Sequence, residues 1–90
     1  MVTPTSTPRF ARGVKFRMDK TRGAWIVLAP ERLFLPDEHA VEILKLVDGQ
    51  RSVQGITDLL AERFAAPVEV IAGDVLALLQ DLADKGVLET

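Results

Sequence analysis

The chain has 90 residues, 48% of them apolar, and a net charge of −2, which together predict one small globular domain. The absence of cysteine excludes a disulfide framework, a thiolate metal site and a cysteine nucleophile. No apolar run approaches the roughly 18 residues that span a bilayer, so we expect no membrane contact. The N-terminus also lacks the apolar stretch of a signal peptide, so we expect a cytoplasmic protein.

Charge is distributed unevenly along the chain. Residues 1–30 carry six basic side chains and one acidic side chain, whereas residues 31–90 carry five basic and twelve acidic ones. This division suits docking to another protein or to a second copy of the chain, so a homodimer is possible. It does not favour nucleic acid as a partner, because a protein that binds phosphates is usually basic overall or on the helix that enters a groove.

The sequence of the first 28 residues predicts a disordered N-terminal segment followed by a β-hairpin. Residues 1–8 are rich in Thr, Ser and Pro and have no periodicity, which is typical of a disordered segment. Apolar and basic residues alternate over 14–18, as in a strand with two different faces. A turn at 19–23 ends in glycine and leads into the apolar run 24–28, which we expect to be a central strand.

A third short strand is predicted over residues 31–35. Pro30 and Pro36 flank it, and proline in a sheet is tolerated mainly at an edge, where a missing amide donor costs little. An edge strand leaves half of its backbone polar groups without a partner. Such an edge is usually a managed liability, but it can also bind an extended peptide.

Three helices are predicted to follow. Pro36 suits the first position of a helix that Asp48–Gly49 terminates. Ser52 can cap a second helix, and Pro67 can open a third that Gly86 ends, which leaves residues 87–89 as a short tail. The expected inner face of the second helix consists of Ile56, Leu59, Leu60 and Phe64. Strands followed by helices in one domain over residues 9–90 predict the α+β class.

The third predicted helix has a wider apolar face than packing against a single neighbouring element requires. At 100° per residue it has two adjacent apolar stripes, which together cover roughly 160°, whereas a surface helix needs about 100°. The helix could be wedged between two elements of its own domain or in a dimer, or one edge of the arc could line a groove for a partner. The stripes are Ile71, Val75, Leu78 and Leu82, and Ala72, Leu76, Leu79 and Ala83.

No catalytic constellation is apparent. His39 is the only histidine, so it has no second imidazole or thiol with which to build a metal site. The glycines do not cluster into a phosphate-binding loop, and the two serines lie in the N-terminal segment and at a helix cap. Trp25 lies in the apolar strand and is expected in the core. We therefore expect neither an enzyme nor a catalytic residue, metal or cofactor.

Several motifs in a fixed order resemble the PqqD family of pyrroloquinoline quinone (PQQ) biosynthesis. They are P-R-F from residue 8, G-V-K-F-R from residue 13, W-I-V-L-A-P-E-R from residue 25, D-G at residue 48 and D-V-x-x-L-L-x-x-L-x-x-x-G-V-L from residue 74. Each motif is weak alone, but the combination is specific and extends from about Pro8 to Glu89. The resemblance implies a winged helix-turn-helix-like domain, with a three-stranded antiparallel sheet followed by three helices.

The resemblance also implies a function. Members of the family act as peptide chaperones, or RiPP recognition elements, that bind the ribosomally made precursor PqqA and present it to the radical S-adenosylmethionine (SAM) enzyme PqqE. In related domains the leader peptide adds to the third strand and packs against the third helix. Carried over, this places the peptide beside Glu31, Arg32, Leu33, Phe34 and Leu35 and against Val70, Ile71, Asp74, Val75 and Leu78.

Two alternatives remain open at this stage. A winged helix could bind DNA, although the acidic second and third helices would repel phosphates. A purely structural dimerisation domain is compatible with the charge division and with the wide apolar arc.

Overall fold

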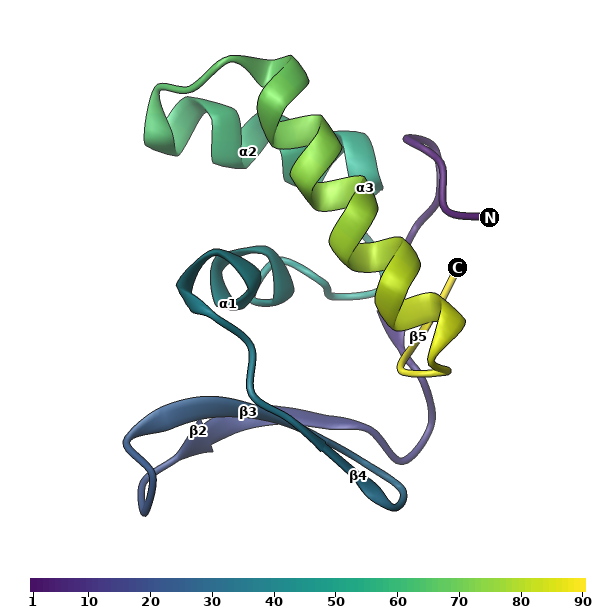
Figure 1. Ribbon diagram of the computed structural model, residues 1–90. Helices are drawn as coiled ribbons and strands as arrows, with labels where there is room; N and C mark the ends of the chain where they lie inside the picture. The colour runs from purple at the N-terminus through teal and green to yellow at the C-terminus, as the bar shows by residue number, and fades with distance from the viewer.

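A computed structural model describes residues 1–90 and has the predicted α+β, winged helix-turn-helix-like architecture. A three-stranded antiparallel sheet lies below three helices, all of which are on one side of it (Figure 1). A second, two-stranded sheet joins the two ends of the chain. The elements are β1 (Arg9–Phe10), β2 (Lys15–Asp19), β3 (Ala24–Ala29), β4 (Arg32–Phe34), α1 (Glu38–Leu44), α2 (Val53–Phe64), α3 (Val68–Asp84) and β5 (Leu88–Glu89).

The larger sheet has the order β2-β3-β4, so β3 is central and β4 is an edge strand, as predicted. Gly23 has a φ of 67° in the turn between β2 and β3, a conformation that glycine adopts without steric cost. The predicted third strand is shorter than expected, because Pro30 and Glu31 form a two-residue turn in which Glu31 has a φ of 63°. Proline followed by a residue with positive φ is the pattern of a type II turn.

One face of this sheet packs on the helices. Phe16, Val27 and Phe34 stand opposite one another across the three strands and therefore share a face. Val27 is 1% exposed and belongs to the hydrophobic core, and the other two pack against that core. The helices supply most of the remaining core, through Ile43, Leu44, Val53, Ile56, Leu60, Val75, Leu79 and Leu82.

The helix ends follow local capping chemistry. The Ser52 hydroxyl accepts a hydrogen bond from the Gly55 amide at 3.0 Å and caps α2, as predicted. The prediction that Pro36 begins α1 is wrong by two residues, because the Asp37 carboxylate accepts from the Ala40 amide at 2.8 Å and makes Asp37 the N-cap. Pro67 precedes α3, and Gly86 follows its end with a φ of 77°.

The expected inner face of α2 is partly wrong. Ile56 and Leu60 are buried, but Leu59 and Phe64 are about half exposed. Leu59 lies about 100° from Leu60 around the helix and therefore points away from α3. Phe64 is the last residue of α2, at the corner before α3. The inner face is completed instead by Val53 and Thr57.

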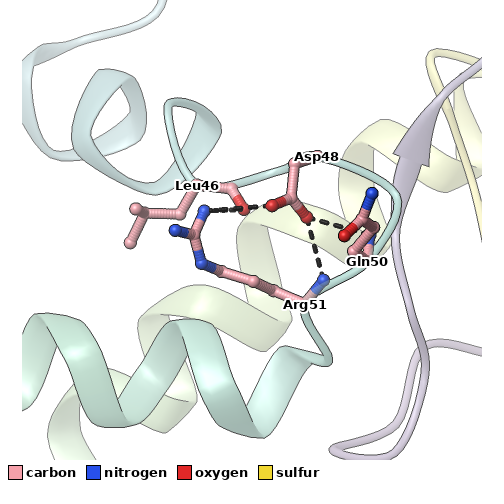
Figure 2. Close-up of polar contacts among 4 residues, drawn as sticks. All are labelled: Leu46, Asp48, Gln50 and Arg51. Atoms are coloured by element: carbon pink, nitrogen blue, oxygen red, sulfur yellow. Dashed lines mark hydrogen bonds and ion pairs between the residues drawn. The ribbon is translucent and has the colours of Figure 1, made fainter.

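The turn between α1 and α2 is held by one carboxylate (Figure 2). Asp48 Oδ1 accepts from the backbone amides of Arg51 at 2.8 Å and Gln50 at 2.9 Å, and Asp48 Oδ2 pairs with the Arg51 guanidinium at 3.2 Å. The pKa of Asp48 lies below its ordinary value. The largest cause is the hydrogen bond from the Arg51 amide, followed by the one from the Gln50 amide and then by the charge of Arg51. The turn therefore prefers the ionised carboxylate.

The N-terminal segment differs from the disordered segment that the sequence predicts. Val2 is 7% exposed in the core, and its amide donates to Gln80 Oε1 of α3 at 2.7 Å. The carbonyls of Ser6 and Pro4 accept from the first amides of α2, those of Val53 and Gln54, at 2.8 and 2.9 Å. The first amides of a helix have no hydrogen-bond partner within that helix. The N-terminal segment supplies this partner, a contact that could not be predicted from the composition of residues 1–8.

The prediction that residues 87–89 form only a short tail is also wrong. Val87 and Leu88 are buried, and β5 pairs antiparallel with β1, so that Arg9 lies opposite Glu89. The Arg9 guanidinium and the Glu89 carboxylate are 3.1 Å apart. The pairing joins the two ends of the domain beside the last turns of α3 (Figure 1).

Candidate functional site

The largest cleft in the protein lies between α1 and α3. Its volume is about 350 Å³. The apolar part of its wall comes from Ala40 and Ile43 on α1 and from Ala77 and Leu78 on α3. Asp37, His39 and Asp74 complete the lining.

This cleft adjoins two smaller ones and shares part of its lining with each. Toward the sheet it shares Ala40 and Leu78 with a cleft of about 160 Å³, which β4 and the residues after it border through Phe34 and Leu35. Toward the corner between α2 and α3 it shares His39, Ile43 and Asp74 with a cleft of about 40 Å³. Phe64, Leu60, Ile71 and Val75 also line this corner. We call these three adjoining clefts together the α1–α3 groove.

The groove begins beside the open edge of β4. This strand pairs only with β3, so its other edge has no partner strand. Phe34 faces the helices and lines the groove, whereas Leu33 lies on the opposite face of the sheet with a 43% exposed side chain. A free backbone edge and an apolar groove are therefore adjacent, the arrangement that strand addition by a peptide requires.

Three carboxylates border the groove. Asp81 pairs with Lys85 at 2.8 Å, near β4, and the Lys85 ammonium also lies 5.8 Å from the centre of the Phe34 ring. Asp37 uses one oxygen to cap α1. Asp74 makes no side-chain hydrogen bond or ion pair. The middle of the groove, where no lysine or arginine contributes to the lining, is therefore acidic.

Six of the ten predicted site residues line the groove. They are Phe34, Leu35, Ile71, Asp74, Val75 and Leu78. The other four do not. Glu31 belongs to the turn before β4, Arg32 and Leu33 lie on the strand itself, and Val70 is 57% exposed outside the groove.

Sequence reasoning missed the contribution of α1. We expected a site between the third strand and the third helix, whereas Ala40 and Ile43 form a wall along the middle of the groove. The apolar face of the first helix was the available signal, but such a face indicates burial without showing what covers it. His39, to which the sequence assigned no role, is exposed and also borders the middle and far clefts.

No group of three or more His, Cys, Asp or Glu residues is arranged to hold a metal ion. None of the helices combines the length and the apolar character that crossing a bilayer requires.

Comparison with known proteins agrees with the fold and the motifs. The PqqA binding protein of Bradyrhizobium diazoefficiens is 53% identical over 87 residues, which cover 97% of this chain and 84% of that protein. The solution NMR structure of the PqqD truncation of Methylobacterium extorquens PqqCD, described as a stand-alone RiPP recognition element, superposes with a TM-score of 0.84 at 41% identity and covers 100% of this chain and 96% of that one. The crystal structure of PqqD from Xanthomonas campestris gives a TM-score of 0.64 at 32% identity and covers 100% of both chains. Residues 24–88 match the family model described as coenzyme PQQ synthesis protein D, and the chain therefore belongs to the PqqD family.

Proposed function

We propose that this protein is a non-catalytic peptide chaperone of PQQ biosynthesis that binds the precursor peptide PqqA. The observation that carries the proposal is the open edge of β4 beside the apolar α1–α3 groove. Relatives that match nearly the whole chain are named PqqA binding proteins, and the solved PqqD truncation of Methylobacterium extorquens PqqCD is described as a RiPP recognition element. Both support a peptide as the ligand.

The peptide binds by adding a strand to β4. Backbone hydrogen bonds to the free edge give affinity that depends little on sequence, and alternate side chains of the added strand point into the groove and are selected there. The proposed contacts are Glu31, Arg32, Leu33, Phe34, Leu35, Val70, Ile71, Asp74 and Leu78, whereas Val75, the remaining predicted residue, is fully buried and supports the groove from within the core.

The other edge of the sheet is less suited to this role. The free edge of β2 carries the charged residues Lys15 and Arg17, and lysine on an edge strand discourages pairing with another chain. None of the residues of β2 lines the groove. A peptide on β2 would therefore gain backbone bonds without side-chain pockets, so β4 is the preferred edge.

We propose further that the bound peptide is presented to the radical SAM enzyme PqqE. This step is supported by the role that the family resemblance implies. An added strand has one edge paired with β4 and leaves its other edge free, so part of the peptide stays accessible to a second protein.

The proposal is tested by titrating ¹⁵N-labelled protein with PqqA and following the amide signals. The expected shifts concentrate at residues 31–35 and 68–79, and PqqE added afterwards broadens the signals of the complex without displacing the peptide. No binding at peptide concentrations up to about 100 μM, with and without PqqE, would reject the function. Retardation of random duplex DNA at low salt would instead support the DNA-binding alternative.

A further inference from the structure

The α1–α3 groove extends well beyond the strand that opens it. Its lining on α3 runs from Leu82 beside β4 to Ile71 at the far corner, which is eleven helical steps or about 16 Å. An extended peptide needs about five residues to cover that distance. Because β4 has only three residues, a segment that merely pairs with β4 covers about 10 Å of this length and leaves the far end of the groove empty.

The chemistry of the groove changes along this path. Beside β4 the lining is largely apolar, and the Asp81 carboxylate there is already paired with Lys85. In the middle, the apolar wall formed by Ala40, Ile43, Ala77 and Leu78 lies next to Asp37, His39 and Asp74. Neither carboxylate forms an ion pair with a basic residue of the chain.

An apolar wall beside unpaired carboxylates is complementary to one class of side chain. Lysine and arginine combine a flexible apolar stem with a charged end, and they cover apolar surface with the stem while the charge stays in a polar setting. An apolar side chain would bring no charge to meet the two carboxylates, and an acidic one would be repelled. Both the shape and the charge of the middle cleft therefore favour a cation.

We propose that the middle of the α1–α3 groove binds a lysine or arginine side chain of the peptide that is paired with β4. The stem packs on the apolar wall, and the charge lies at the carboxylates of Asp37 and Asp74. This inference rests on the proposed function, because it assigns a second specificity element to the same bound peptide. The apolar cleft beside β4 is the first element, and the cation fixes the register of the peptide along the groove.

The chain offers clean variants for a test. Asp37→Asn removes the charge and keeps a good N-cap acceptor, and Asp74→Asn removes the second charge without a change of volume. Asp84→Asn is the matched control, since Asp84 is on the same helix and lies outside the groove, where it accepts a hydrogen bond from Gln80. Circular dichroism establishes that each variant is folded before binding is compared.

Affinity for PqqA is measured by calorimetry with each protein, and with PqqA peptides in which each lysine or arginine is replaced singly by glutamine. Each groove variant is expected to weaken binding about two- to fivefold, the range for exposed ion pairs, and Asp84→Asn less than 1.5-fold. One peptide substitution is expected to cause a similar loss, and that loss should vanish when Asp37 and Asp74 are both replaced, as in a double-mutant cycle.

Two outcomes would overturn the inference while leaving the proposed function intact. The first is PqqA binding that is unchanged by both groove variants, with amide shifts still at β4. The second is an equal loss from Asp84→Asn, which would indicate an effect of net charge without a specific site. If wild-type protein does not bind PqqA at all, the proposed function itself fails.

Discussion

A proline at residue 33 would test the binding edge directly. Pro30 and Glu31 form a two-residue turn, so Ala29 and Arg32 are the closing pair of the hairpin. Along an antiparallel pair of strands, the backbone N–H and C=O groups of one residue point toward the partner strand, and those of the next residue point away from it. We expect the Arg32 amide to face β3 and the Leu33 amide to face the open edge.

The Leu33→Pro variant should therefore lose peptide affinity but little stability. The lost amide removes one hydrogen bond to the peptide, with a net value of about 0.5–1.5 kcal/mol, or about two- to tenfold in affinity. The ring also occupies the space that the incoming strand needs. The φ that proline requires is available on an edge strand, so the cost to folding should stay below about 1 kcal/mol.

Neighbouring substitutions provide the controls. Arg32→Pro removes an amide directed at β3, and it places proline after Glu31, whose φ is 63°. An unfolding cost of about 1–3 kcal/mol is expected, which lowers Tm by about 4–8 °C per kcal/mol. Leu33→Ala isolates the loss of the partly exposed side chain.

The assay combines thermal unfolding with calorimetric titration of PqqA. Leu33→Pro should fold like Leu33→Ala and bind more weakly. Equal affinity in Leu33→Pro and Leu33→Ala would refute binding at this edge. A fall in Tm as large as that of Arg32→Pro would refute the assigned direction of the amides.

Three further predictions concern stability. Val2→Ala removes two methyl groups from a buried side chain and should cost about 1–2 kcal/mol, seen as a lower Tm; an unchanged Tm would show that Val2 is not docked in solution. The low pKa of Asp48 means that its contribution is complete above the unfolded pKa of about 3.9 and is lost as pH falls through the folded pKa. Urea midpoints measured from pH 5 to pH 2 should therefore fall less steeply for Asp48→Asn than for the wild type, and parallel curves would contradict this assignment. Val75→Glu buries an unpaired charge at a fully buried position and should abolish the folded circular dichroism spectrum, whereas Asp74→Asn, one residue earlier and exposed, should keep it; a folded Val75→Glu protein would place Val75 outside the core.

The sequence determined the features that depend on neighbouring residues. Gly23 predicted the turn between the first two strands of the sheet, Ser52 the start of α2 and Gly86 the end of α3. Pro30 and Pro36 predicted that the third strand lies at an edge. Each signal is local, because a backbone conformation or a cap involves residues a few positions apart.

Only the tertiary structure decided what joins the ends of the chain and what completes the groove. The Val2 amide meets Gln80, and Arg9 meets Glu89, across about 80 residues. No periodicity encodes such pairs, since they arise only when the helices and the sheet have packed. In the same way, the apolar face of α1 was evident from the sequence, but its position opposite α3, where it leaves an acidic cleft open, follows from how the two helices pack above the sheet. Local spacing fixes which residues share a face, and packing decides which part of that face remains accessible to a partner.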